Sequence, residues 1–389
     1  ARMNVSSRWA QGVGLWCVAA IVATAVIGPG RASAGGASAR GAEVQLFGAG
    51  ATFPQPLYER WVKAFQKAHP EIQIEYNGQG SGAGIKAISD QTVDFAGSDA
   101  PLTKTERAAM DASGGATNAA VVFPSVAGGV VPAFNIPGVT ELNLSGEVLS
   151  KIYMGSISKW NDPAIVELNK DATLPDLAIT PVGRTDGSGT TFVFTNFLIS
   201  QSKDFAKTIG AGKSVKWLPG TQGGKGNPGV AAVVQQTPGA IGYMEHNYAA
   251  QNSISYAAVQ NKAGKFVKAT PDTVSKAASG SESRMVPPVL VDNIWNASDE
   301  EAYPIASFTY LIVYSDLKNL SNAAEAQALV DFFAWAVGEE GQKIATENDY
   351  APLPDGVRQR VLEQLGMLTY KGAPLRAPAT DTPAEAMGE

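Results

Sequence analysis

The chain has 389 residues, of which 44% are hydrophobic and 17% charged, a composition typical of a globular protein too long for one small domain. Its formal charge of −6 argues against a nucleic-acid partner, because that role depends on basic surface that replaces phosphate counterions. One cysteine and two histidines argue against disulfides, thiol catalysis and a protein-bound metal. We therefore expect two lobes and chemistry that uses neither metal nor thiol.

Residues 1–34 have the pattern of a cleavable secretory signal. Arg2 and Arg8 precede an apolar stretch at 13–27, and Arg-Ala-Ser-Ala at 31–34 supplies small residues for cleavage. An uncleaved membrane anchor is the alternative, but the uninterrupted apolar run is shorter than the roughly 20 residues of a spanning helix. Cleavage would remove the only cysteine and three arginines, so the formal charge would move from −6 to −9. A chain this acidic would have to bind an anion through local, fixed dipoles.

Strand and helix patterns alternate in the first part of the chain. Apolar residues at helical spacing predict a helix at 55–68 that ends at His69 and Pro70. The other elements predicted here are strands at 44–47, 71–76 and 93–96 and a short helix around 85–88. This alternation predicts a parallel sheet. Two glycine-rich stretches, 48–53 and 78–84, lie where a strand gives way to a helix, so we interpret them as strand-to-helix corners.

The rest of the chain continues the α/β pattern. Thr103 and Glu106 form a capping box that begins a helix. The later elements are strands at 121–123, 126–134, 177–182, 240–244 and 303–314, and helices at 145–153, 228–236 and 323–337. Residues 262–285, rich in Lys, Gly, Ser and Thr, are predicted to be a surface excursion. Residues 372–389, rich in Ala, Pro and Thr, are predicted to be a disordered tail.

The stretch 183–192, Gly-Arg-Thr-Asp-Gly-Ser-Gly-Thr-Thr-Phe, is the strongest candidate binding motif. Arg184 offers a planar charged fork, and Ser188 and Thr190 offer hydroxyls. The glycines let backbone N–H groups approach a ligand without a Cβ in the way. The element that follows would point unpaired N–H donors and its positive dipole end at an anion. This combination predicts a cradle for a small oxyanion.

Other interpretations of the motifs are weaker. Gly78 to Ala83 fits the loose dinucleotide pattern with Asp99 as the ribose acid, but this leaves Arg184 unexplained. A serine hydrolase with Ser188 as nucleophile lacks the glycine spacing of a nucleophile elbow. His69 is expected to cap a helix and His246 to lie in a loop, so neither is an obvious base. Each corner alone could be a simple turn, with Arg184 a surface cation paired to Asp186.

Seven segments together resemble the phosphate-binding subunit of the bacterial high-affinity phosphate ABC transporter. They are 48–54, 80–82, 93–102, 183–194, 215–217, 223–227 and 238–243, within a resemblance that runs from about residue 45 to residue 370. The resemblance implies an α/β, periplasmic binding protein type II fold of two lobes joined by two hinge crossover strands, near 126–131 and 303–305. The implied organisation is a signal peptide at 1–34, a first lobe at 42–127 and 303–371, a second lobe at 128–302, and the tail at 372–389.

The resemblance also implies a ligand site and partners. The ligand would be inorganic phosphate, bound in the cleft without cofactor, metal or catalytic residue. The implied phosphate contacts are Thr52, Phe53 (through its N–H), Ser81, Asp99, Arg184, Ser188, Gly189 and Thr190, with Asp186 aiming the arginine. The implied partners are the permease subunits in the inner membrane, and the protein would be a periplasmic monomer. Residues 262–300 and the tail follow no family pattern, which leaves surface partners open.

The expected selectivity rests on Asp99. Phosphate near neutral pH carries a proton, whereas sulfate carries none, so an ionised carboxylate can accept a hydrogen bond from phosphate but faces sulfate with lone pairs. A buried site that leaves such a group unpaired rejects the analogue by about 10⁴ to 10⁵. Contacts from both lobes would favour the closed form. A secreted phosphatase or esterase, and a secreted adhesin or sensor, remain as alternative functions.

Overall fold

The computed structural model describes residues 44–115 and 118–377, all within one compact unit, Gly41–Glu389. The predicted signal at 1–34 and the end of the predicted tail, 378–389, lie outside the described residues. None of the helices in the described ranges combines the length and hydropathy needed to cross a membrane.

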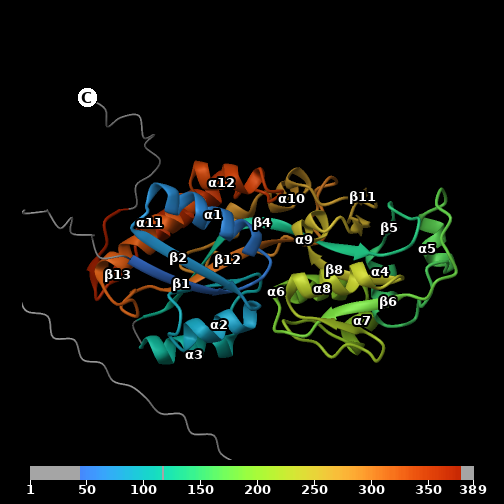
Figure 1. Cartoon of the computed structure of the whole chain (residues 1–389), viewed down its shortest axis with the longest axis horizontal. Helices are drawn as coiled ribbons and strands as arrows, with labels where there is room; N and C mark the ends of the chain where they lie inside the picture. The colour runs from blue at the N-terminus through green and yellow to red at the C-terminus, as the bar shows by residue number, and fades with distance from the viewer. Residues whose placement is uncertain (1–43, 116–117, 378–389) are drawn as a thin grey trace, which may run out of the picture. The chain divides into compact units, whose positions relative to one another are not determined.

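A nine-stranded sheet runs through the described residues (Figure 1). Its order is β2-β1-β3-β12-β4-β8-β6-β7, and β9 pairs with β4. β1 pairs in parallel with β2 and β3, as the strand–helix–strand alternation predicts, and β6 pairs in parallel with β7 and β8. The strands are β1 (Val44–Gly50), β2 (Ile72–Gly78), β3 (Phe95–Ser98), β4 (Ala120–Phe134), β6 (Thr180–Arg184), β7 (Gln222–Gly224), β8 (Ala240–Glu245), β9 (Ser255–Tyr256) and β12 (Ala306–Tyr314).

β4 joins the two halves of this sheet. Its residues 120–129 pair antiparallel with β12, and its residues 130–134 pair antiparallel with β8. The change of partner falls inside the crossing predicted at 126–131. Beside it, the N–H of Val130 donates to the carbonyl of Ile305, where the chain enters β12. We call β1, β2, β3, β12 and the start of β4 the first-lobe strands, and β6–β9 with the end of β4 the second-lobe strands.

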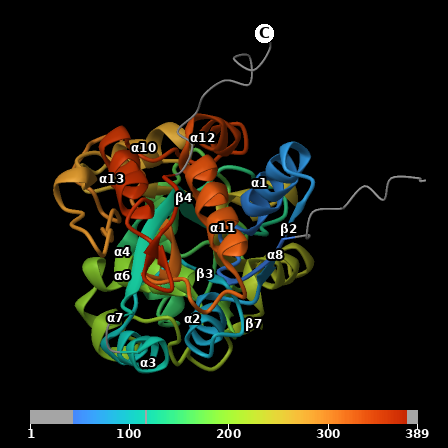
Figure 2. The ribbon, with the colours of Figure 1, turned by 90° about the vertical axis from the view of Figure 1, so that its left-hand side faces the viewer.

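Helices cover both sides of the first-lobe strands. Figure 2 shows α1, α11 and α12 on one side and α2 and α3 on the other. The helices are α1 (Gln55–Ala68), α2 (Ser81–Ser89), α3 (Lys104–Gly114), α4 (Gly146–Tyr153), α5 (Pro163–Leu168), α6 (Gly189–Gln201), α7 (Lys203–Thr208), α8 (Gly226–Gln236), α9 (His246–Gln251), α10 (Pro271–Ala278), α11 (Ala323–Val337), α12 (Glu339–Thr346) and α13 (Asp355–Leu365), with a 3-10 turn η1 (Ser281–Ser283). Two small sheets hold β5 (Asn143–Leu144) with β10 (Ala258–Gln260) and β11 (Phe266–Val267), and β13 (Thr369–Tyr370) with β14 (Ala373–Pro374).

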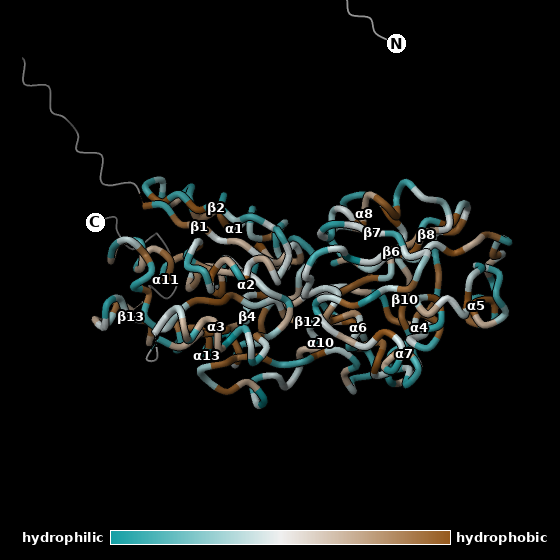
Figure 3. The backbone as a smooth tube through the Cα atoms, turned by 90° about the horizontal axis from the view of Figure 1, so that it is seen from below, coloured by the Kyte–Doolittle hydropathy of each residue, from teal (hydrophilic) through white to brown (hydrophobic). Residues whose placement is uncertain are grey.

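The hydrophobic core extends through both lobes. Figure 3 shows hydrophobic stretches along β4 and in each lobe. In the first lobe the ring of Phe333 lies 5.2 Å from that of Phe95 and 5.6 Å from that of Phe123. In the second lobe Phe194 of α6 stacks on Tyr243 of β8 at 4.4 Å. Such pairs add about 0.5–1.5 kcal/mol beyond their burial. These results, with the sheet topology, confirm the predicted two-lobed α/β fold.

Several predicted elements keep their bounds. α1 and α11 span the predicted residues, and the Thr103–Glu106 capping box precedes α3. The strands predicted at 121–123 and 126–134 form one strand, β4. Pro124 does not interrupt it, because its missing N–H falls where the pairing with β12 is irregular and the register shifts between Thr309 and Tyr310.

Three predictions in the C-terminal half need correction. The predicted surface excursion at 262–285 contains α10, whose Val274 and Ala277 are buried; Pro271 at its first turn is a signal that the composition argument overlooked. Residues 372–377 are not disordered, because β14 pairs with β13 and Arg376 binds Asp331. Residues 128–302 do not all belong to the second lobe, since the N–H of Leu290 donates to the carbonyl of Val122 in the first-lobe part of β4.

Candidate anion site

The first corner follows β1 and presents Thr52 and Phe53, both buried. Thr52 Oγ1 accepts hydrogen bonds from the backbone N and Nδ2 of Asn227, at 3.0 and 2.9 Å. The carbonyl of Phe53 accepts a bond from the Tyr350 hydroxyl at 2.8 Å. The N–H of Phe53 takes part in no hydrogen bond among the described residues, so it remains available to a ligand.

The second corner joins β2 to α2 and presents Ser81, which is fully buried at the first position of the helix. Ser81 Oγ accepts bonds from the N–H groups of Gly189, at 3.0 Å, and Asp99, at 3.3 Å. The N–H of Gly82 donates to the carbonyl of Gly187 at 2.8 Å. This corner of the first lobe therefore touches the start of α6 in the second lobe.

Asp99 follows β3 and is 2% exposed. Its Oδ1 accepts a bond from the Thr309 hydroxyl at 2.9 Å, and its Oδ2 accepts one from the Thr190 hydroxyl at 3.3 Å. Burial is the largest influence and raises the pKa of Asp99 to about 7, although the two hydroxyls and the charge of Arg184 lower it. Burial thus brings the pKa of this carboxyl close to neutral pH, whereas the selectivity expected from the sequence needs an ionised Asp99.

Arg184 is the last residue of β6, and its side chain is 1% exposed. Its Nε and Nη2 donate to the two carboxylate oxygens of Asp186 at 2.8 and 2.5 Å, so the predicted pairing is present. Asp186 also accepts a bond from the N–H of Gly226. Burial would raise the pKa of Asp186, but these bonds and the guanidinium charge hold it below its usual value. Arg184 Nη1 is buried and has no hydrogen-bond partner among the described residues.

The start of α6 faces the same region. Ser188 caps the helix, and its Oγ accepts a bond from the N–H of Thr191 at 3.0 Å. Gly189 follows, and a Cβ there would lie 2.6 Å from Ser81 Oγ and 2.7 Å from Asp99 atoms, so only glycine allows this approach. The N–H of Gly189, expected to bind phosphate, donates to Ser81 in this structure. The positive end of the helix dipole favours an anion here.

These contacts link Ser81, Asp99, Gly189 and Thr190 directly to one another. Thr52 joins them through Asn227, whose Nδ2 lies 3.4 Å from Thr190 Oγ1. Residues predicted from both lobes thus form one buried polar cluster. Arg184 adjoins it through Asp186, which accepts a hydrogen bond from the N–H of Gly226 next to Asn227, and Arg184 Nη1 is buried without a partner in the described structure.

Three further residues of this region, Asn227, Glu245 and Tyr248, were not predicted from the sequence. Asn227 closes the motif 223–227, but no role was assigned to it. Glu245, at the end of β8, accepts bonds from Asn247 and from the Tyr350 hydroxyl, and burial raises the pKa of Glu245 to about 8. Tyr248 donates to the carbonyl of Thr52. Their partners lie far away in the chain, so no local sequence pattern marks Glu245 or Tyr248 as part of the site.

Gly80 tests whether the second corner positions the Arg184–Asp186 pair. Its φ of +97° and a Cβ position 2.2 Å from Asp186 Oδ2 mean that Gly80→Ala would displace the carboxylate. We expect phosphate binding to weaken about tenfold or more, as for loss of a charge-assisted hydrogen bond. Gly138→Ala is the control, because Gly138 also has a positive φ, +79°, but nothing lies within 4 Å of its Cβ position. Calorimetry showing equal affinities for both variants would contradict this expectation.

The structure does not support a hydrolase site at Ser188. Ser188 Oγ is bonded to a backbone N–H, and neither histidine is bonded to it. His69 caps α1 and lies 3.7 Å from Glu71. His246 is not a loop residue as expected; it begins α9, is buried, and bonds the Tyr256 hydroxyl at 3.0 Å. Within the described ranges no three His, Cys, Asp or Glu side chains are grouped so that they could hold a metal.

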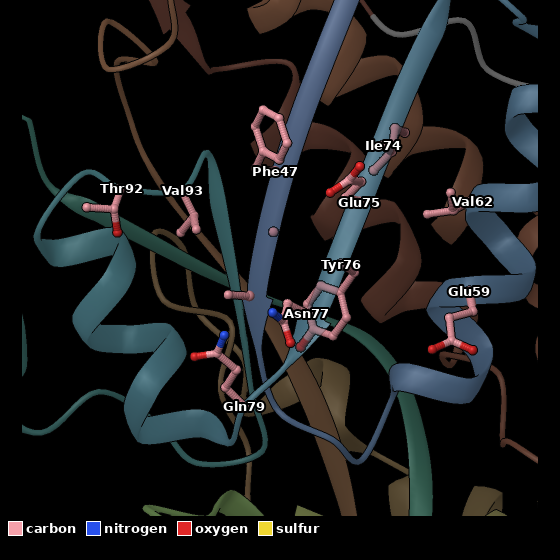
Figure 4. Close-up of a pocket in the computed structure, with 12 residues that line it drawn as sticks. Phe47, Glu59, Val62, Ile74, Glu75, Tyr76, Asn77, Gln79, Thr92 and Val93 are labelled. Atoms are coloured by element: carbon pink, nitrogen blue, oxygen red, sulfur yellow. The ribbon is translucent and has the colours of Figure 1, made fainter. Parts of the chain in front are cut away.

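A surface groove of about 620 Å³ lies elsewhere, on β1 and β2 between α1 and α2 (Figure 4). Its walls include the aromatic rings of Phe47 and Tyr76 and the carboxylates of Glu59 and Glu75. A groove with two carboxylates and no arginine or lysine in its lining is unsuited to a small oxyanion. The buried cluster is therefore the better candidate site.

Comparisons with known proteins agree with this assignment. A family model described as a PBP superfamily domain matches residues 32–340. The phosphate-binding protein PstS of Pasteurella multocida is 42% identical over 323 residues, which cover 82% of this chain and 89% of that protein. The chain belongs to the PstS family of phosphate-binding proteins. This confirms the resemblance found in the sequence, and the relative is named as a binding protein rather than as an enzyme.

Solved structures related to this PstS family member have the same fold. A high-affinity periplasmic phosphate-binding protein, PfluDING, solved with phosphate at pH 8.5, is 25% identical with a TM-score of 0.67, over 82% of this chain and 93% of that one. An ABC-type phosphate transport receptor from Vibrio cholerae is 19% identical with a TM-score of 0.51, over 79% and 100% of the two chains. The second likeness bears on the fold alone.

Proposed function

We propose that this protein captures inorganic phosphate in the buried cluster between its lobes and delivers it to an ABC transporter. The observation that carries the proposal is Arg184 Nη1, a buried guanidinium nitrogen without a partner in the described structure. A buried donor left unpaired costs about 1–3 kcal/mol, and more when it is charged. An oxyanion is the group that would satisfy it, and the family membership of the chain points to phosphate as that oxyanion.

The proposed contacts are those expected from the sequence. Donors to the phosphate oxygens would be the Phe53 N–H, the Thr52, Ser81 and Ser188 hydroxyls, and Arg184 Nη1. Thr190 would donate through its N–H, and Gly189 would have to exchange its bond to Ser81 for one to phosphate. Asp99 would be the one acceptor and would take the proton of the phosphate. Sulfate brings no proton, so it would meet the ionised Asp99 carboxylate with lone pairs on both sides.

Phosphate would bind best when the two lobes meet around it. Besides the Gly82–Gly187 bond, Lys213 Nζ lies 2.6 Å from Glu106 Oε2 of α3. Contacts of this kind link the lobes, and an anion bound by groups from both lobes would add to them. Binding would therefore shift an open–closed equilibrium towards the closed form, which the permease subunits of the inner membrane would recognise.

The location and organisation follow from the same assignment. We propose that residues 1–34 are removed as a signal peptide, that the mature protein acts as a monomer in the periplasm, and that the chain crosses between its lobes near 126–131 and enters β12 near 303–305, the stretch around Leu290 already lying against the first lobe. The change of strand partners within β4 supports the first crossing.

Titration of purified, ligand-stripped protein with phosphate and with sulfate tests the proposal. We expect calorimetry at pH 8 to show one phosphate site and sulfate bound at least about tenfold more weakly than phosphate, because the Asp99 carboxyl is then mostly ionised. Small-angle scattering should show a more compact protein after phosphate is added. Absence of phosphate binding, or release of phosphate from a phosphate monoester, would refute the proposal.

A further inference from the structure

The Thr52 hydroxyl receives both of its protein hydrogen bonds from one residue of the opposite lobe. Asn227, the second residue of α8, places its backbone N 3.0 Å and its Nδ2 2.9 Å from Thr52 Oγ1. Asn227 is fully buried and Thr52 is 2% exposed, so water does not compete for these bonds.

The chemistry of a hydroxyl limits what Thr52 can then do. A threonine hydroxyl has two acceptor lone pairs and one proton. Two N–H donors occupy both lone pairs, so the remaining capacity of Thr52 is to donate its proton. No acceptor for that proton exists among the described residues, whereas a phosphate oxygen beside Arg184 Nη1 would supply one.

The amide of Asn227 is itself fixed. Its Oδ1 accepts a hydrogen bond from the backbone N–H of Glu245 at 3.2 Å, which determines that Nδ2, and not Oδ1, faces Thr52. Nδ2 also lies 3.4 Å from Thr190 Oγ1, a longer contact with a second candidate ligand. The β8 backbone thus fixes which way the Asn227 amide is turned. The amide in turn leaves the Thr52 hydroxyl to act as a hydrogen-bond donor.

From this geometry we propose that Asn227 is a positioning residue that holds the Thr52 hydroxyl as a hydrogen-bond donor to phosphate. The inference rests on the proposed function. Because Thr52 belongs to the first lobe and Asn227 to the second, the hydroxyl is fixed as a donor only when the lobes meet. Closure therefore completes the donor set in addition to enclosing the ligand.

A double-mutant cycle on the full chain tests this role, with calorimetric titration of inorganic phosphate into ligand-stripped protein. We expect Thr52→Val to weaken phosphate binding about 10- to 100-fold and Asn227→Ala about 5- to 10-fold, the range for hydrogen bonds to a charged group and between neutral groups. In the Thr52→Val background, Asn227→Ala should weaken binding less than about twofold, because its effect passes through the missing hydroxyl.

Tyr248→Phe is the matched control. Tyr248 also reaches the first corner from the second lobe, but it bonds the carbonyl of Thr52 and not the hydroxyl. Its effect on phosphate affinity should therefore be the same in wild-type and Thr52→Val proteins. If Asn227 served only to hold the lobes together, Asn227→Ala in the wild-type background would weaken phosphate binding no more than Tyr248→Phe, which also removes one bond between the lobes at this corner, and the proposal would be overturned.

The remaining outcomes are also decisive. Unchanged phosphate affinity in a folded Asn227→Ala variant would overturn the proposal. Asn227→Ser, whose side chain is too short to reach Thr52, replaces the alanine variant if that protein fails to give a cooperative thermal transition. A wild-type protein that binds no phosphate would instead refute the proposed function, and this is measured separately at the start of the cycle.

Discussion

Replacing Arg184 with alanine is expected to weaken phosphate binding by at least about 1.5–3 kcal/mol, roughly 10- to 150-fold. The side chain is 1% exposed, its Nε and Nη2 are held by Asp186, and its Nη1 is the free donor aimed at the proposed anion. Removal would therefore take away one charge-assisted hydrogen bond and the only full positive charge proposed to contact the ligand. Calorimetric titration with phosphate measures the change.

Two further variants make this result specific. Arg184→Lys keeps the charge but loses the planar fork held by Asp186, so it should recover only part of the affinity. Arg284→Ala is the matched control, because Arg284 also binds a carboxylate, that of Asp292, but makes no contact with the cluster. Thermal melting of each protein should accompany the titrations, since Arg184→Ala leaves the Asp186 carboxylate without its partner. Normal phosphate affinity in folded Arg184→Ala would place the ligand elsewhere.

The second large effect is expected for sulfate, in Asp99→Asn. The amide can donate a hydrogen bond, so sulfate binding should become about tenfold tighter at pH 8, where the wild-type carboxyl is mostly ionised. Phosphate affinity should fall less than sulfate affinity rises. Asp94→Asn is the control, because Asp94 also has a pKa raised by burial, yet it bonds the Phe47 N–H away from the cluster. Equal exclusion of sulfate by wild-type and Asp99→Asn proteins would contradict this role.

The pKa of Asp99 adds a pH dependence to sulfate binding. With a pKa of about 7, raised mainly by burial against the effects of Thr309, Thr190 and Arg184, the carboxyl is protonated below pH 7 and can then donate to sulfate. Sulfate affinity should fall about tenfold per pH unit above pH 7 and level off below it, because the protonated fraction follows that course. In Asp99→Asn the dependence should disappear. The charges of nearby Asp186 and Glu245 also interact with Asp99. Glu245→Gln therefore tests whether the pH dependence of sulfate affinity comes from Asp99.

The same group affects the stability of the anion-free protein. The folded pKa of Asp99 lies above the value of 3.8 for a free side chain. The stabilisation that this raised pKa gives the folded protein is therefore fully present below about pH 4 and is lost as the pH rises through about 7. A phosphate proton shared with the carboxylate would offset this loss when the ligand is bound.

The sequence alone determined the elements whose signals are local. The helical stripe at 55–68, the capping box at Thr103, and the glycines that mark strand-to-helix corners all depend on residues within a few positions of one another. The specific motifs also identified the family, and through it the candidate residues from Thr52 to Thr190. The composition of 262–285 did not predict α10, because a short helix of this kind becomes stable only by packing on β4 and β12.

Only the tertiary structure decided how these residues act together. The pairing of Asp186 with Arg184 was visible as a local pattern, but the unpaired Nη1 depends on the burial that both lobes create. The partners of Thr52 lie 175 and 196 positions away in the chain, and the hydroxyl on Asp99 Oδ1 comes from Thr309, 210 positions away. Desolvation, which raises the pKa of Asp99, likewise depends on every element packed around it, and no sequence spacing encodes that.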